Sequence, residues 1–320
     1  MTRWVSSDSH LLEMPDMYQN YAARRWRSVA PRNASSKTLG DVLICDGMSL
    51  VLPLHEILGG DPCRITEIPH AAYQPAARLT LLAASELAAE LLFPTLGLFL
   101  EQHPDREYFH EFAWAYNRWL TSEWTGVAGL YPMIMLGGRD SARDKRAAIT
   151  FATEHHMRGI LLPSAPLTGC WASAEHGRFF SDAAEAGLLI AFHAFSRPVR
   201  PGVLRAAAAV FTAAHEAMDA VSELVLGGVL DAHRDLRVLF GEGQSWWIGE
   251  WLRRVTGTTE PGELPAWSNQ IRVTDSTYPS VGGNLISWAN DYPHGCGGGE
   301  SYRIERLDVP DSYYDGAFWL

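Results

Sequence analysis

Short apolar runs alternate with longer stretches of helical periodicity over most of the chain. Each run is bounded by turn residues, which is typical of buried strands. The predicted strands cover residues 3–7, 127–136, 158–163, 188–193, 236–243 and 284–291. The segments between them predict helices over 141–155, around 181–186, over 206–226 and over 248–254. Strands that alternate with helices predict a parallel sheet covered by helices.

The segment after the first predicted strand has a different pattern. It is punctuated by Pro and Gly as far as Pro75, which indicates an irregular insertion, and helical spacing then predicts helices over 78–92 and 108–123. The apolar stretch 81–100 is interrupted by polar residues and Pro94, so it predicts a buried helix and not a membrane span. We expect one domain over residues 1–320, with an insertion and helices over about 30–125 after strand one.

Polar residues follow several of the predicted strands at the point where each strand ends. His10, His193, Glu242 and Asp291 all occupy such positions. The length of 320 residues suits one large core, and barrel enzymes build their active sites from the ends of several strands. The pattern predicts an α/β fold of the TIM (β/α)8 type with an active site at the carboxyl ends of its strands. The Gly-rich, irregular stretch after residue 294 predicts a shortened or distorted C-terminal end.

These strand-end residues are of types that bind metal ions. Asp8 and His10 are two positions apart on one strand, so their side chains point to the same face and can hold one ion. His193 follows a run of apolar residues, where an imidazole requires a partner. Asp291 ends an apolar strand, and a buried carboxylate without a cation is costly. A divalent metal is therefore expected.

Charge and cysteine content exclude several classes of function. The net charge is −11, and a nucleic-acid groove or an anionic membrane surface would require a basic surplus. The four cysteines form no CxxC pair, which disfavours a thiolate zinc site and indicates free thiols in a reducing compartment. The polar N-terminal segment has no apolar signal core, so a cytoplasmic enzyme is expected. The abundant aromatic residues leave room for a homodimer.

Several segments together resemble the amidohydrolase superfamily, in its branch of metal-dependent hydrolases and non-oxidative decarboxylases. The resemblance runs nearly end to end, through SSDSHLLEMPDMY, RGILLPSAP, AFHAFS, LVLGGVLDAHRDLRVLFGEGQSWW and ANDYPH. It implies a TIM barrel whose strands one, five and eight carry metal ligands. By this resemblance the ligands are Asp8, His10, His193 and Asp291.

Three positions depart from the family pattern. The first motif is Asp8-x-His10 where His-x-His is most familiar, and Glu242 stands where many decarboxylases of the branch place an acid/base His. Ser164 stands where dinuclear members often supply a bridging Lys or carboxylate.

Weaker candidates surround this set. His294, three residues after Asp291, is expected to line the pocket or add a ligand, with a turn position beside Pro293 as the alternative. Glu13 fits either a carboxylate that orients Asp8 or an arginine, or a surface charge. Aromatic residues near the motifs predict an aromatic-walled pocket for an apolar or aromatic small molecule, although core packing explains each one equally well: Trp171, Trp246, Trp247, Trp288 and Tyr292.

Two chemistries fit these residues. In the first, a metal-activated water hydrolyses the substrate, or the substrate is decarboxylated, with Asp291 as the acid/base and with Glu242 and His294 as further catalytic groups. In the second, which we favour narrowly, Glu242 joins the ligands and one or two iron ions activate oxygen to hydroxylate an apolar substrate. Carboxylate-rich ligand sets favour iron, with zinc and manganese as alternatives. A metal-free scaffold is disfavoured because Asp8, His10, His193 and Asp291 are all ligand types.

Overall fold

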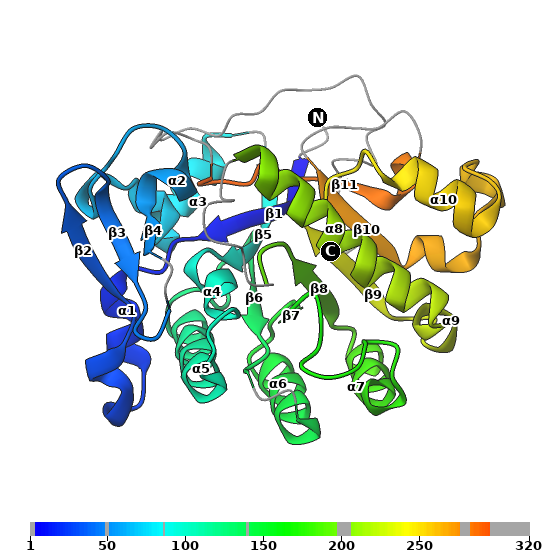
Figure 1. Ribbon diagram of the computed structural model, residues 1–320, viewed down its shortest axis with the longest axis horizontal. Coiled ribbons are helices and arrows are strands. Elements are labelled where there is room, and N and C mark those ends of the chain that lie inside the picture. Colours follow the sequence, from blue (N-terminus) through cyan, green and yellow to red (C-terminus); the bar gives the residue numbers. More distant parts are fainter. Residues whose placement is uncertain are drawn as a thin grey trace.

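Eight parallel strands form the centre of the computed structural model, which describes residues 4–48, 51–85, 87–138, 141–196, 206–275 and 282–294. Neighbouring strands follow one another in chain order around the sheet. The strands are β1 (Trp4–Leu11), β5 (Leu87–Pro94), β6 (Leu130–Met135), β7 (Gly159–Leu162), β8 (Leu189–His193), β9 (Arg237–Gly241), β10 (Ile271–Asp275) and β11 (Ile286–Trp288). This is the predicted TIM-barrel arrangement, with helices between the strands (Figure 1).

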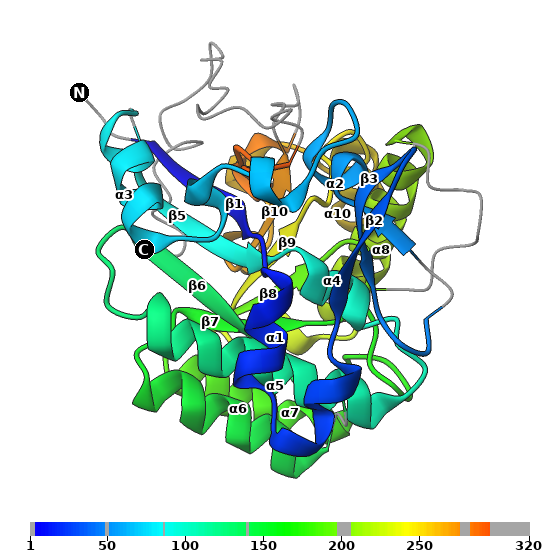
Figure 2. The ribbon, with the colours of Figure 1, turned by 90° about the vertical axis from the view of Figure 1, so that its left-hand side faces the viewer.

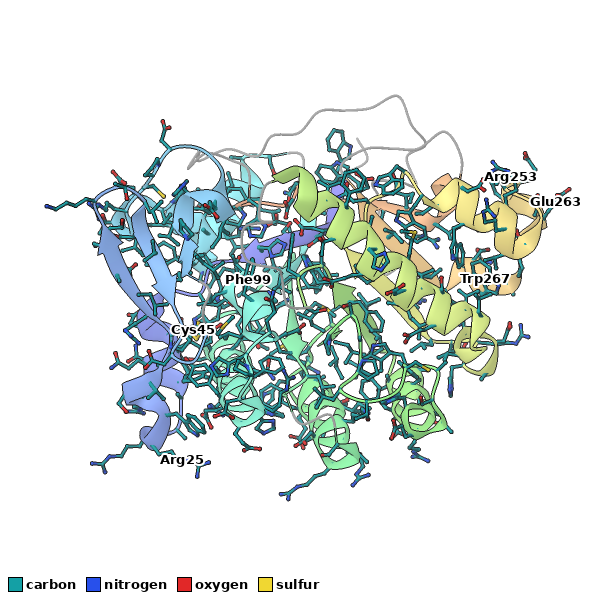
Figure 3. All side chains as sticks on the ribbon, in the orientation of Figure 1. Arg25, Cys45, Phe99, Arg253, Glu263 and Trp267 are labelled. Carbon is teal, nitrogen blue, oxygen red and sulfur yellow. The ribbon has the colours of Figure 1, made fainter. Side chains whose placement is uncertain are left out.

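Helices cover the outside of this sheet. Three of them, α5, α6 and α7, lie side by side along one side of the barrel in both ribbon views (Figures 1 and 2). The longer helices are α5 (Arg106–Glu123), α6 (Ala142–Glu154), α7 (Ala174–Glu185), α8 (Ala206–Leu226) and α10 (Ile248–Thr256), and α9 (Val229–Ala232) is a single turn. Apolar side chains fill the space between helices and strands, whereas charged ones such as Arg25 and Arg253 project outward (Figure 3).

The segment after β1 contains more regular structure than its composition predicts. It forms α1 (Pro15–Tyr21) and an antiparallel sheet of β2 (Arg32–Ser36), β3 (Gly40–Ile44) and β4 (Val51–Pro53). Three further helices follow, namely α2 (Leu54–Leu58), α3 (Pro75–Ala83) and α4 (Leu96–Leu100). Barrel strand β5 starts at Leu87, so the segment inserted between β1 and β5 ends before that residue. This end lies inside the predicted range 30–125.

Two barrel strands differ from the sequence-based prediction. The predicted helix over 78–92 is wrong after α3, because residues from Leu87 onward form β5. Nearly all of β5 is buried, so its sequence LAAELLFP shows no alternation of apolar and polar residues. Strand β10 was not predicted, since IRVTD has only five residues, too few to establish a period. The shortened or distorted C-terminal end predicted after residue 294 falls outside the described residues.

The barrel closes between β1 and the residues that follow β11. The Asp291 amide donates to the Asp8 carbonyl at 3.1 Å, and the His10 amide donates to the Tyr292 carbonyl at 2.6 Å. These two bonds continue the ladder beyond the three-residue strand β11. They place three of the predicted site residues on adjacent backbone segments. No helix of the described residues combines the length and the apolar composition that crossing a membrane requires.

A buried ion pair stabilises this closure between β1 and the residues after β11, which we call the seam. The Arg78 guanidinium donates to both carboxylate oxygens of Glu90, at 2.7 and 3.1 Å, and neither side chain is exposed. Arg78 also donates to the carbonyls of His10 and Tyr292 and stacks on the Tyr292 ring. Glu90 in turn accepts from the Ser9 hydroxyl and from the side-chain amide of Asn290. The pair thus links α3 and β5 to both sides of the seam.

Replacing Arg78 with Met is expected to lower the free energy of unfolding by about 3–5 kcal/mol, because it leaves the Glu90 carboxylate buried without its cation. The measurement is urea denaturation followed by circular dichroism. The double variant Arg78→Met/Glu90→Leu is expected to recover part of the loss. Glu250→Gln, which removes an ion pair on the surface of α10, is the control and is expected to change stability little. A single Arg78 variant as stable as this control would contradict the role given to the pair.

Candidate metal centre

The predicted strand-end residues meet at one end of the barrel. Asp8 and His10 lie on β1, His193 is the last residue of β8, and Asp291 follows β11. The ligand atoms of Asp8, His10 and His193 all lie within 4.8 Å of one another, and those of His10, Asp291 and His294 form a second such group. Glu242 directly follows β9 and belongs to neither group. The carboxyl ends of parallel strands share one edge, which is why residues so far apart in sequence converge.

Hydrogen bonds turn one oxygen of Asp8 toward the two imidazoles. Its Oδ2 atom accepts from the Glu242 amide and from the Thr274 hydroxyl, each at 2.9 Å. The other oxygen, Oδ1, lies 3.3 Å from His10 Nε2 and 3.5 Å from His193 Nε2. Asp8 is therefore anchored through one oxygen and presents the other.

Each imidazole is oriented in the same way by a backbone carbonyl. His10 Nδ1 lies 2.9 Å from the Pro94 carbonyl, and His193 Nδ1 lies 3.2 Å from the Ala194 carbonyl. A carbonyl only accepts, so we assign the proton of the neutral ring to Nδ1 in both residues. The Nε2 lone pairs then point into the site, which is the arrangement of metal-binding histidines.

The buried ligand atoms have no hydrogen-bond partner among the residues that the structure describes. This holds for Asp8 Oδ1, His10 Nε2 and His193 Nε2. Asp291 Oδ1 lies 3.3 Å from His10 Nε2 and belongs, with His294, to the second group of ligand atoms. Burying polar atoms without partners is costly, and a divalent cation would satisfy the first three, with Asp291 beside them. Two imidazoles and two carboxylates fit zinc, manganese or iron.

The charges of the site shift the pKa values of His10 and Asp8 so that the ionised form of each is favoured. Burial alone would lower the pKa of His10, but Asp291 and Asp8 raise it well above its usual range. Burial alone would raise the pKa of Asp8, but His193 and His10 lower it well below its usual range. The carboxylates therefore require a cation, and either a proton on His10 or a metal ion supplies it.

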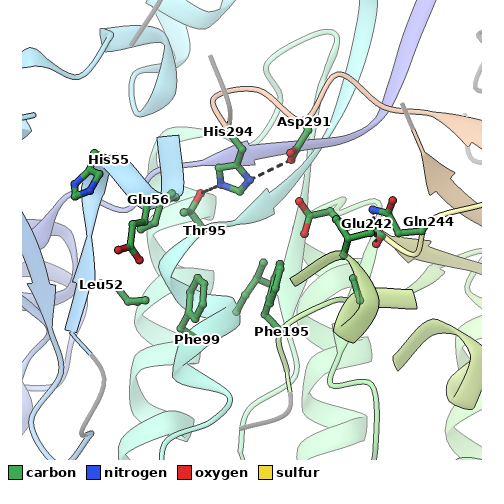
Figure 4. Close-up of a pocket in the computed structure, with 14 residues that line it drawn as sticks. Leu52, His55, Glu56, Thr95, Phe99, Phe195, Glu242, Gln244, Asp291 and His294 are labelled. Atoms are coloured by element: carbon green, nitrogen blue, oxygen red, sulfur yellow. Dashed lines mark hydrogen bonds and ion pairs between the residues drawn. The ribbon is translucent and has the colours of Figure 1, made fainter. Parts of the chain in front are cut away.

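His294 forms part of a chain of hydrogen bonds behind Asp291. Its Nδ1 atom lies 3.1 Å from Asp291 Oδ1, and its Nε2 atom lies 3.2 Å from the Thr95 hydroxyl (Figure 4). The backbone amides of Thr95, Leu96 and Gly97 all donate to the Glu13 carboxylate. His294 thus lines the pocket and orients Asp291. Glu13 is neither of its predicted alternatives, because it is fully buried and accepts from the backbone amides at the start of α4.

Glu242, which follows β9, and Asp291, which follows β11, both line the pocket (Figure 4). Both have a positive φ, 52° and 55°, a left-handed conformation that side chains other than Gly rarely adopt. Burial and the neighbouring Asp291 raise the pKa of Glu242 well above its usual range. Ser164 lies at the end of β7, where its amide donates to the Ser196 hydroxyl and its own hydroxyl accepts from it.

A pocket of about 500 Å³ opens beside these groups. Its apolar walls include Phe99 and Phe195, whose rings stack at 5.8 Å, and side chains from β4 and α2 of the inserted segment. None of the five aromatic residues predicted for the pocket lines it. Trp171, Trp247, Trp288 and Tyr292 are buried in the core, and Trp246 is 57% exposed. Sequence reasoning missed Phe195, although it stands two residues after His193, and it had no signal for His55 and Glu56.

Comparison with known proteins agrees with this geometry. A family model described as amidohydrolase matches residues 74–301, which is more than half of the chain. The chain belongs to this amidohydrolase family. The resemblance inferred from the sequence motifs is therefore confirmed. A search among curated proteins finds no match.

Solved structures share the fold of this amidohydrolase at low sequence identity. An amidohydrolase from Mycobacterium avium subsp. paratuberculosis K-10 is 17% identical with a TM-score of 0.71, covering 94% of this chain and 90% of its own. The 5-carboxyvanillate decarboxylase of Novosphingobium aromaticivorans, solved with bound manganese, is 14% identical with a TM-score of 0.64, covering 99% and 94%. The Sphingomonas paucimobilis enzyme of the same name is 16% identical with a TM-score of 0.63, covering 99% and 98%.

Replacing either His10 or His193 with Ala is expected to remove most of the bound metal, because each change deletes one of the converging ligand atoms. The parent protein is expected to hold about one ion per chain after dialysis against metal-free buffer, measured by elemental analysis. His215→Ala is the matched control, since His215 lies exposed on α8. If His10→Ala and His215→Ala retained equal amounts of metal, the ion would have to bind elsewhere.

Proposed function

We propose that this protein is a metal-dependent hydrolase that cleaves an ester or amide bond in a small, uncharged and largely apolar substrate. The observation that carries the proposal is the convergence of Asp8 Oδ1, His10 Nε2 and His193 Nε2, all buried and without partners, at the edge of a pocket that Asp291 also lines. Membership of the amidohydrolase family supports it.

The four proposed ligand residues differ in their exposure to solvent. Asp8, His10 and His193 are fully buried, whereas the Asp291 side chain is 34% exposed. These four residues would hold the metal. A divalent ion bound there supplies a Lewis acid and a water molecule of lowered pKa.

Asp291 is the group that can move a proton. Its carboxylate reaches both the ligand atoms and the pocket, and His294 holds it in one orientation through a 3.1 Å contact. Asp291 Oδ1 therefore takes the proton of the attacking water in this proposal. Glu242 lines the pocket next to it and is placed to return a proton to the leaving group.

The lining of the pocket indicates the substrate class. Its walls are mostly apolar, and the negative carboxylates of Glu56 and Asp291 face it, whereas the raised pKa of Glu242 favours its neutral form. Such a lining repels an anionic substrate except where the metal itself neutralises the charge, and it accepts an uncharged apolar molecule. An aromatic ring fits beside Phe99 and Phe195, which line one wall (Figure 4).

Non-oxidative decarboxylation is the second candidate. The two 5-carboxyvanillate decarboxylases share the fold over 99% of this chain, and the aromatic wall of the pocket would suit an aromatic acid. The negative charges of Glu56 and Asp291 in the lining disfavour it. Oxygenation by a pair of irons, which the sequence favoured narrowly, has no support from the comparisons. Glu242, the extra ligand that this chemistry would require, lies outside both groups of ligand atoms.

The deciding experiment compares the metal-loaded protein on uncharged aryl esters and anilides, on aromatic carboxylic acids, and on apolar substrates under oxygen. Hydrolysis is expected, with one ¹⁸O atom from labelled water in the acid product. Release of CO₂ from an aromatic acid, without ester or amide cleavage, would establish the decarboxylase instead. Oxygen uptake by protein holding two irons would establish the oxygenase. Full ester or amide cleavage by metal-free protein would overturn the metal-dependent mechanism.

Asp291→Asn is expected to lower kcat about 10²–10⁴-fold, because the amide does not accept a proton from water. Metal content is measured in the same preparation, so that loss of the ion and loss of the base are separated. Asp231→Asn, at an exposed position on α9, is the control. Unchanged kcat in metal-loaded Asp291→Asn would remove Asp291 from the mechanism.

His294→Gln is expected to lower kcat about 10–100-fold with metal content unchanged, since His294 orients Asp291 without belonging to the buried ligand group. Thr95→Val removes only the hydrogen bond to His294 Nε2 and is expected to give a smaller loss in the same direction. Steady-state kinetics measure both changes. Loss of metal in His294→Gln would instead make His294 a ligand.

A further inference from the structure

A second cavity lies at the opposite end of the barrel. Its volume is about 580 Å³, and it is formed where β7, β8, β9 and β10 begin. Three arginines line it: Arg158, just before β7, Arg234, and Arg237, the first residue of β9. Asp235 is the single carboxylate among the described lining residues. The cavity therefore carries a positive charge in a chain whose net charge is −11.

The sheet register brings two of these arginines together. Leu189 of β8 pairs with Gly159 of β7 on one side and with Arg237 of β9 on the other. Strands lie about 4.8 Å apart, so the Cα atoms of Arg158 and Arg237 are separated by about 10 Å. Both side chains reach into the same cavity and can contact one ligand between them. Burial and the charge of Arg237 lower the pKa of Arg158, as expected for two neighbouring cations.

The Arg158 guanidinium is only partly satisfied by the protein. Its Nε atom is buried and has no hydrogen-bond partner, and within the described part of the chain neither Arg158 nor Arg234 forms an ion pair. An unpaired buried donor on a charged group is costly. Placing like charges together adds a further cost. An anion bound in the cavity would offset both.

We propose that this cavity binds a small oxyanion with at least two negative charges, of the phosphate or polycarboxylate type. Guanidinium groups bind planar or tetrahedral oxyanions through paired hydrogen bonds. The volume lies in the range of small-molecule sites and exceeds that of one inorganic ion, so the ligand is a metabolite that carries such a group. The proposal is independent of the function proposed for the metal centre, because the two cavities share no lining residue.

Calorimetric titration with inorganic pyrophosphate, and separately with citrate, tests the proposal. Pyrophosphate also binds divalent metals, so the titrated protein carries His10→Ala and is free of metal. One pyrophosphate or one citrate is expected to bind per chain. The probe with the higher affinity shows whether the cavity prefers phosphate or carboxylate ligands. Adding Arg158→Gln or Arg237→Gln is expected to weaken binding at least about 10-fold. Arg146→Gln, at an exposed position on α6, is the matched control and is expected to bind as the parent does.

Thermal denaturation checks that the variants fold. Without ligand, Arg158→Gln is expected to melt at or above the temperature of the parent, because it removes one of two neighbouring cations. Absence of binding by both probes at 10 mM, or equal binding by the Arg158 and Arg146 variants, would overturn the proposal.

Discussion

Closure of the barrel between β1 and the residues after β11 is the constraint on which the rest of the structure depends. Two backbone hydrogen bonds across this seam bring Asp8 and His10 next to Asp291. The Arg78–Glu90 pair supports the seam from inside, with bonds to both sides of it. This support allows a cluster of buried ligand atoms to remain without partners, since the barrel holds them in place whether or not an ion compensates them.

The two ends of the barrel have opposite electrostatic character. The carboxyl end carries Asp8, Asp291 and Glu242 near an apolar pocket, whereas three arginines line the cavity at the amino end. The inserted segment contributes only to the first, through β4 and α2, which wall the pocket. The groups proposed to bind the metal thus come from the barrel strands, and those proposed to contact the substrate come in part from a segment added to the barrel. This division is typical of barrel enzymes, in which loops vary on a constant scaffold.

Much of the fold could be predicted because apolar runs and helical spacing are local properties of a chain. Most elements from β6 to α10 agree with the prediction to within a few residues, although α7 begins well before the predicted stretch and the single turn α9 was not predicted. Strand β10, which follows α10, was also missed. Strand β5 was assigned to a helix, since a strand that is buried on both faces has no alternating pattern to distinguish it. The antiparallel sheet of β2, β3 and β4 was missed because its strands, RNASS, GDVLI and VLP, are short and show no sustained alternation of apolar and polar residues.

The sequence by itself determined which residue types occupy the site and which strands carry them, since the residues at the end of a predicted strand are known without coordinates. Tertiary structure alone decided which atoms meet. It placed Glu13 against the backbone amides at the start of α4 and left Glu242 outside the ligand groups. It buried four of the five aromatic residues predicted for the pocket in the core. It also assembled the pocket from Phe99, Phe195 and the inserted segment, and set Arg158 beside Arg237. The reason is physical: distances between residues far apart in sequence follow from barrel closure and sheet register, which no local pattern encodes.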